Sequence, residues 1–172
     1  MQGFDMKSSG GIAALPYMLL FVCTVGAGKL ADWLIQHHLS VRTTRITVQA
    51  IAFVGSGLSM SLTGFMPSSG LAVSCIIFSI VITGFSQAAI GVNYVDLSPH
   101  YPGVFFSIGN TIANVAGMLA PIVVGHILVS GQSHHRRVDE WQEVFYISTA
   151  VLAGALVAWV ALCQGKPQSA LN

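Results

Sequence analysis

The sequence predicts an all-α integral membrane protein with five transmembrane helices. Of its 172 residues, 53% are hydrophobic and only 8% are charged, whereas soluble domains carry about 25% charged residues. Five apolar runs each reach the roughly 20 residues that a membrane-spanning helix needs. These runs lack the alternation, over segments of about ten residues, that is typical of the strands of a membrane barrel. We therefore expect helices embedded in a lipid bilayer.

The five predicted helices span residues 12–35, 46–66, 71–97, 104–130 and 144–163. The first connection, QHHLSVRTTR, is polar and basic, and the second, PSSG, is short. The third, SPHYPG, contains two prolines and a glycine, which predict a tight turn. Basic residues favour the cytoplasmic side of a membrane. Their distribution, four against three, favours a cytoplasmic location for HHLSVRTTR and for the C-terminus.

The fourth predicted helix combines small residues with two amides. Small residues recur on one stripe and would let a neighbouring helix approach closely; they are Gly109, Ala113, Gly117 and Gly125. Asn110 and Asn114 lie on the adjacent stripe, where lipid would leave their polar groups unsatisfied. Pro121 removes a helical hydrogen bond and is typical of a kink that faces other helices or a cavity. Two interpretations of the amides are open: hydrogen bonds to another helix, worth about 0.6 kcal/mol on average, or the lining of a cavity for a polar solute.

The third predicted helix is polar towards its end, in the run GFSQAAIGVNYVDL. Gln87, Gly91 and Tyr94 share one helical face. Asn93 is adjacent to Tyr94 in the sequence. Asp96 precedes the turn SPHYPG, so we expect it at the membrane surface, held by a helix end or by the basic segment. These side chains are candidates for contacts with a solute or between helices.

Charged residues cluster at the end of the first predicted helix, in GAGKLADWLI. Lys29 and Asp32 lie there, followed by Arg42 and Arg45. Two roles fit this pattern equally: a charged latch between helices, or charges that only set the orientation in the membrane.

Several classes of function are disfavoured by the sequence. The net charge of +1 gives no sign of a nucleic-acid partner. The cysteines fall in separate apolar runs and are interpreted as free thiols; they are Cys23, Cys75 and Cys163. Adjacent histidines on loops do not offer a chelating geometry, so we expect no metal site and no cofactor. No paired nucleophile and base stands out, and we expect no enzyme.

Four stretches, taken in order, follow the pattern of a known transporter family. LPYMLLFVCTVGAGKLADWLI ends in a G-x-L-A-D signature that includes Gly28 and Asp32. GFSQAAIGVNYVDLSPHYPG ends in a D-[IL]-[AS]-P-x-Y turn, IGNTIANVAGMLAP carries an I-x-N-T-x-A-x-x-x-G-x-x-x-P pattern, and EWQEVFYI follows. The chain resembles the C-terminal half of the anion:cation symporters of the major facilitator superfamily, which include sialin, vesicular glutamate transporters and sodium-phosphate cotransporter-like proteins. Pro102 and Ser107 depart from the pattern, where the family has a small residue and a glycine.

The resemblance implies that residues 1–172 form a partial C-terminal bundle, helices eight to twelve of a twelve-helix fold. It implies secondary active transport of an organic or inorganic anion by alternating access, coupled to a proton or sodium, in a plasma or endolysosomal or vesicular membrane. The missing N-terminal bundle would supply charge recognition. The alternative is a non-transporting membrane protein that assembles with a full-length relative.

The resemblance also divides the candidate residues by role. Neutral hydrogen bonds to the solute would come from Gln87, Asn93, Tyr94 and Asn110. The structural or gating set would be Gly28, Asp32, Arg42, Arg45, Asp96, Asn114 and Pro121. Asn110 coincides with a family asparagine, which favours a solute contact, whereas Asn114 keeps the interpretation of a hydrogen bond between helices.

Overall fold

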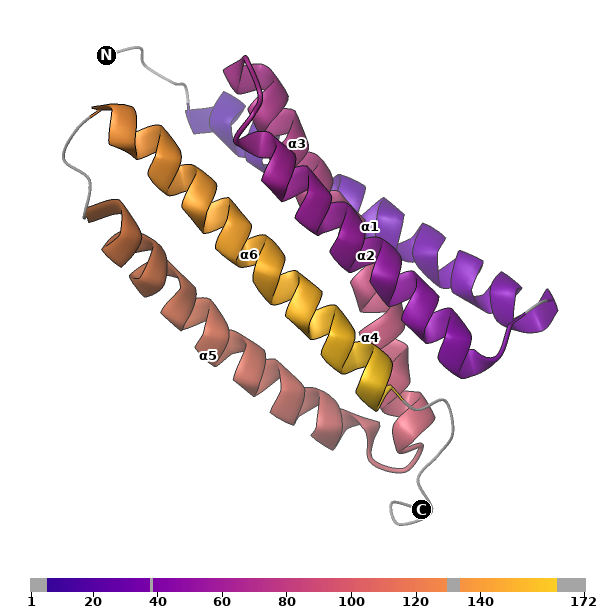
Figure 1. The fold of residues 1–172 in the computed structure, drawn as a ribbon. Helices are drawn as coiled ribbons and strands as arrows, with labels where there is room; N and C mark the ends of the chain where they lie inside the picture. Colours follow the sequence, from indigo (N-terminus) through magenta and orange to yellow (C-terminus); the bar gives the residue numbers. More distant parts are fainter. Residues whose placement is uncertain (1–5, 38, 130–133, 164–172) are drawn as a thin grey trace.

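The computed structural model describes residues 6–37, 39–129 and 134–163, and side chains within 14–37, 39–96, 98–127 and 141–163. The described residues form six helices and no strand (Figure 1). The helices are α1 (Met6–His37), α2 (Val41–Thr63), α3 (Ser69–Ile82), α4 (Gly84–Leu97), α5 (Pro102–Val129) and α6 (His134–Leu162).

Five stretches of these helices are long and apolar enough to cross a membrane. They are Ala14–His37, Val41–Thr63, Ser69–Asp96, Pro102–Ile127 and Trp141–Leu162. Each coincides with one of the five predicted apolar runs, so the predicted all-α membrane fold is confirmed. Large apolar side chains on the outer faces are exposed, as lipid-facing positions require; Phe21, Ile112 and Met118 are examples.

The third predicted helix differs from the structure, because it is broken into α3 and α4 at Thr83. The Thr83 N–H bonds to the carbonyl of Ile80 at 3.2 Å, a tighter pattern than that of an α-helix. The Thr83 hydroxyl donates to the same carbonyl at 2.6 Å. The N–H groups of Ser86 and Gln87 both bond to the Thr83 carbonyl. These bonds satisfy backbone groups that a break inside the membrane would otherwise leave unpaired.

Two other helix starts have clear local causes. The Ser40 side chain accepts a hydrogen bond from the Thr43 N–H at 3.2 Å, which caps α2 at its first turn. Helix α2 therefore begins at Val41, five residues before its predicted start at residue 46, and Arg42 and Arg45 lie on the helix. Pro102 is the first residue of α5, a position that suits proline because its missing N–H has no helical partner there.

Helix α2 lies at the centre of the bundle and α5 at its edge (Figure 1). Helix α2 contacts α1, α3, α4 and α6, whereas α5 contacts α4 and α6. The buried cluster where α1, α2 and α4 meet consists mainly of small side chains: Ala27, Ala31, Val48, Ala88 and Ala89. Small side chains allow close backbone approach, which drives helix association where lipid is as apolar as the protein.

Gly84 makes a close approach to the backbone of α1. A Cβ at Gly84 would lie 2.9 Å from the Thr24 amide nitrogen and 3.1 Å from the Leu20 carbonyl oxygen. The Thr24 hydroxyl is also fixed there, because it donates to the same carbonyl at 2.9 Å. Gly84 is therefore required by the contact between α1 and α4.

We expect Gly84→Ala to lower the free energy of unfolding by about 1–3 kcal/mol, the usual cost of forcing an extra methyl group into a packed contact. Gly117→Ala is the matched control, because a Cβ there would meet no atom within 4 Å. Unfolding of both variants in mixed detergent micelles measures the difference. Equal stability of the two variants would contradict the close contact.

Candidate solute-binding site between α4 and α5

A cavity of about 350 Å³ lies between α4 and the first half of α5. Its lining residues are Ser86, Gln87, Ile90, Gly91 and Tyr94 from α4, and Phe106, Gly109, Asn110 and Ala113 from α5. The cavity brings together Gln87, Tyr94 and Asn110, three of the four residues predicted to contact a solute. Their roles towards a solute stay predictions.

Tyr94 and Gly109 set the distance between the two helices at this site. A Cβ added to Gly109 would overlap the Tyr94 hydroxyl, so the absence of a side chain at Gly109 makes room for the phenol. The Tyr94 ring also meets the Phe106 ring edge to face, with centroids 5.9 Å apart and an interplanar angle of 87°. The phenol is thus held against α5, with its hydroxyl beside the cavity.

Three of the four polar side chains that line the cavity have no partner among the described residues. Within the described residues, the side chains of Gln87, Tyr94 and Asn110 make no hydrogen bond to another protein group. Two amides and a phenol offer both donors and acceptors. Unpaired polar groups are costly inside a membrane unless they face a solute or water. The arrangement can therefore bind a small polar molecule through neutral hydrogen bonds.

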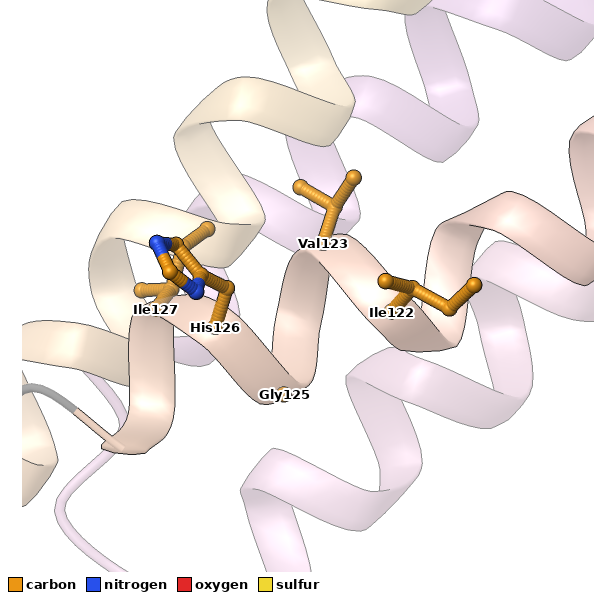
Figure 2. Close-up of a pocket in the computed structure, with 5 residues that line it drawn as sticks. All are labelled: Ile122, Val123, Gly125, His126 and Ile127. Atoms are coloured by element: carbon orange, nitrogen blue, oxygen red, sulfur yellow. The ribbon is translucent and has the colours of Figure 1, made fainter.

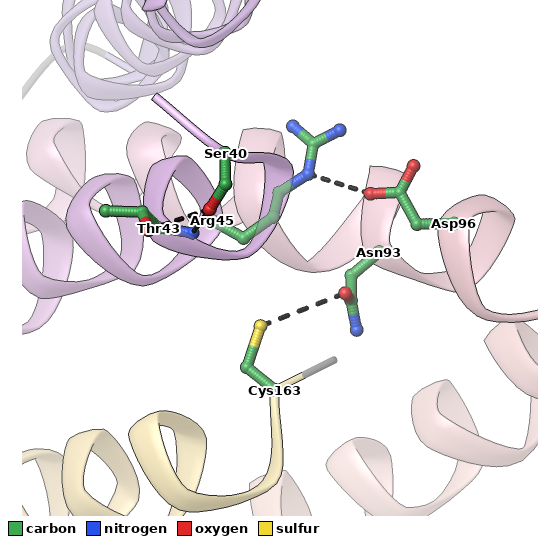
Figure 3. A network of polar contacts seen from close by, with 6 residues as sticks. All are labelled: Ser40, Thr43, Arg45, Asn93, Asp96 and Cys163. Carbon is green, nitrogen blue, oxygen red and sulfur yellow. Dashed lines mark hydrogen bonds and ion pairs between the residues drawn. The ribbon is translucent and has the colours of Figure 1, made fainter. Parts of the chain in front are cut away.

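Asn93, the fourth predicted contact, lies outside this cavity. It faces the end of α6, where the Cys163 thiol donates to its side-chain oxygen at a long distance of 4.0 Å (Figure 3). Burial raises the pKa of the Cys163 thiol, so the group stays protonated and can donate. All three cysteines are free thiols, as predicted.

The predicted small-residue stripe of α5 meets a neighbouring helix at one end. Gly109 approaches Tyr94, but a Cβ at Gly117 or Gly125 would meet no atom within 4 Å. Asn114 is exposed, and its side-chain amide donates to the Asn110 carbonyl of the same helix at 2.7 Å. Pro121 lies within α5 and is exposed as well. The predicted bond from Asn114 to another helix has no counterpart in the described residues and stays a prediction.

Charged residues join α2, α4 and α6 at one end of the bundle. Arg45 Nε donates to Asp96 Oδ2 at 3.0 Å, with side-chain exposures of 5% and 23% (Figure 3). Arg42 donates to the carbonyls of Val160 and Cys163, each at 2.9 Å. An arginine on the last carbonyls of a helix satisfies unpaired acceptors and complements the helix dipole.

The other charged candidates lie apart from this cluster. Lys29 and Asp32 are exposed on α1, and Asp32 makes no ion pair with the described residues. Gly28 has no side-chain neighbour that would oppose a Cβ within 4 Å. A latch through Asp32 stays a prediction, whereas the contacts of Arg42 and Arg45 are present.

Two further cavities lie along α5. One, of about 510 Å³, is lined by Ile122, Val123, Gly125, His126 and Ile127 (Figure 2). These residues all come from one helix, so the cavity is a hollow in its surface. The other, of about 660 Å³, lies between α5 and the helices α2, α3 and α6, and is mainly apolar. Neither cavity gathers unpaired amides as the α4–α5 cavity does. Within the described part of the chain, no three metal-ligating side chains form a cluster.

Sequence reasoning missed two polar residues connected with the α4–α5 cavity. Ser86 lines it, and Gln49 of α2 donates to the Ser86 hydroxyl oxygen at 3.0 Å from behind. The glutamine inside the apolar run ITVQAIAF could have predicted such a contact, because a buried amide needs a hydrogen-bond partner. Serine is common in membrane helices and gave no signal of its own.

The sequence of this chain is similar to sequences of known transporters. No family model matches the chain. Over 167 residues, 96% of this chain, it is 28% identical to vesicular glutamate transporter 2.1 of Danio rerio and 26% identical to vesicular glutamate transporter 1 of Bos taurus and to vesicular glutamate transporter 2 of Homo sapiens. The chain spans 28–29% of the length of these relatives. The predicted resemblance is confirmed: this multi-pass membrane chain is related, over nearly its whole length, to vesicular glutamate transporters of the anion:cation symporter family in the major facilitator superfamily.

Proposed function

We propose that the chain forms part of a secondary transporter for a small organic or inorganic anion and that the α4–α5 cavity binds the solute. The observation that supports this most directly is the meeting of Gln87, Tyr94 and Asn110, all without protein partners, in one cavity. Its volume of about 350 Å³ lies at the lower end of the range for small-molecule sites, roughly 300–1,000 Å³. The names of the relatives support an anionic solute.

The cavity provides only part of the recognition that an anion needs. None of its lining residues is charged, so it offers hydrogen bonds and no countercharge. In secondary transporters, the solute site lies between two repeats or bundles that rock against each other. We infer that the cationic groups and the ion-coupling groups lie in a second bundle that faces this cavity.

The test uses a fusion in which residues 1–172 replace the matching region of the Danio rerio transporter, reconstituted in liposomes. A proton gradient and a sodium gradient are applied in separate experiments. We expect one of them to drive uptake of labelled glutamate by the fusion, and that gradient identifies the coupling ion. Residues 1–172 alone, reconstituted in the same way, should show no gradient-driven uptake. An inactive fusion that is folded, or coupled uptake by the chain alone, would contradict the proposal.

A second candidate function is that of a non-transporting partner of a full-length relative. The observation in its favour is the open face of α5, where a Cβ at Gly117 or Gly125 would meet no atom within 4 Å and the polar Thr111 and Asn114 are exposed. Such a face suits close approach by another helix. Co-purification of the chain with a full-length relative from detergent, together with an inactive fusion, would favour this role over transport.

A further inference from the structure

We propose that Ser86 donates a hydrogen bond directly to the bound anion and that Gln49 is the positioning residue that keeps the Ser86 hydroxyl hydrogen available for it. This inference rests on the proposed function of the α4–α5 cavity. It adds to the site one solute contact from α4 and one residue from α2, a helix that does not line the cavity.

Gln49 is fixed behind the cavity wall. Its side chain is completely buried, and its Nε2 donates to Ser86 Oγ at 3.0 Å. Its other polar atom, Oε1, is buried and has no partner in the described residues. Either orientation of the amide leaves two of its polar groups unpaired, so the direction of this bond rests on the geometry of the structure, in which Nε2 faces Ser86 Oγ. The amide therefore presents a donor to Ser86.

This contact determines what Ser86 can offer to the cavity. A serine hydroxyl has one hydrogen to donate and two lone pairs that accept. Gln49 occupies a lone pair of Ser86, so the Ser86 hydrogen must find an acceptor elsewhere. No described residue accepts it. The cavity that Ser86 lines is where an acceptor can come from, and a carboxylate oxygen of the solute is an acceptor without a competing donor.

Three exposed or half-buried serines of this chain make a local bond instead. Ser74, Ser107 and Ser148 each donate to the carbonyl four residues earlier, at 2.9, 2.7 and 2.8 Å. This local bond is the usual way in which a helical serine satisfies its hydroxyl. Ser86 makes no such bond to Ile82. Its hydroxyl is turned away from the common local bond by an inter-helix contact, which is what a positioned donor requires.

The Ser56–Ser79 pair offers a matched control. These hydroxyls also link α2 to the third membrane span, with an Oγ–Oγ distance of 2.7 Å, and both are buried. They line the larger, apolar cavity, not the α4–α5 cavity. Ser79→Ala thus removes an inter-helix hydroxyl between α2 and α3, in the same membrane span as Ser86 but away from the proposed solute.

The experiment measures L-glutamate binding to residues 1–172 in lipid nanodiscs by saturation-transfer-difference NMR, which detects weak affinities. We expect Ser86→Ala to weaken the affinity about 10-fold or more, the size of one hydrogen bond to a charged group. Gln49→Leu should weaken it by a similar factor, because Ser86 can then turn to the Ile82 carbonyl. The double variant should be no weaker than Ser86→Ala, and Ser79→Ala should match the wild type. Thermal unfolding of each variant identifies any loss of fold.

The outcomes separate the two proposals. Wild-type binding that Ser86→Ala leaves unchanged would overturn the inference and leave the proposed cavity intact. Additive effects of the two substitutions would show that Gln49 does not act through Ser86 and would also overturn it. No binding by the folded wild-type chain would contradict the proposed cavity itself, and the inference would fall with it.

Discussion

Asp96→Asn is expected to lower the free energy of unfolding by about 3 kcal/mol. Arg45 is 5% exposed and donates to Asp96 at 3.0 Å, so the substitution leaves a buried guanidinium without its countercharge. Breaking a buried ion pair from one side costs about 3–5 kcal/mol, and the 23% exposure of Asp96 places the effect at the lower end. Unfolding of the variant in mixed detergent micelles, at constant detergent composition, measures it.

Two further variants distinguish the effect of losing the Arg45–Asp96 ion pair from the effect of removing any charged side chain. Asp32→Asn removes an exposed carboxylate from α1 and should change stability by less than about 0.5 kcal/mol, as other surface substitutions do. Arg45→Gln combined with Asp96→Asn removes both charges and should recover part of the loss, because no uncompensated charge stays buried. A double variant that is less stable than Asp96→Asn would show that Arg45 contributes to stability mainly in another way.

The five membrane spans could be predicted because apolar length decides whether a helix enters a bilayer. The break at Thr83 could not, since the third span is long and apolar enough on average to read as one continuous helix, and hydropathy does not report a local change in backbone hydrogen bonding. A threonine followed by a glycine is ordinary in membrane helices. The reason for Gly84 lies in α1, a helix distant in sequence, whose Leu20 carbonyl and Thr24 amide leave no room for a Cβ.

Part of the cavity could be predicted from spacing along single helices. Gln87, Gly91 and Tyr94 recur at intervals of four and three residues, and all three line the α4–α5 cavity. Asn93 precedes Tyr94 by one residue, which is a rotation of about 100° around the helix, and it faces α6 instead. The same spacing rule that grouped the first three residues could have set Asn93 apart.

Contacts between different helices could not be predicted from the spacing of residues along one helix. The pairs Gln49–Ser86 and Arg45–Asp96 join residues that are 37 and 51 positions apart. Their partners follow from the packing of α4 against α2, which no pattern within one helix specifies. Arg45 was placed before the second helix because the predicted start followed hydropathy, whereas the Ser40 cap begins α2 at Val41.

Asn110→Ala and Asn114→Ala are expected to have unequal effects on glutamate uptake by the fusion described above. Asn110 lines the cavity, and its side chain has no partner in the described residues, so its loss removes a hydrogen bond to the solute. A hydrogen bond to a charged group is worth about 1.5–3 kcal/mol, which predicts a loss of about 10-fold or more in uptake at low glutamate.

Asn114 does not line the cavity and already donates to the Asn110 carbonyl at 2.7 Å, so Asn114→Ala should leave uptake within about twofold of the wild type at equal expression. The comparison is internally matched, because both substitutions remove an amide from the same helix one turn apart. The reverse ranking would assign the solute contact to Asn114 and would require α5 to turn relative to α4, away from the contact that Tyr94 makes with Gly109. A large effect of both substitutions would instead favour a second helix on this face of α5.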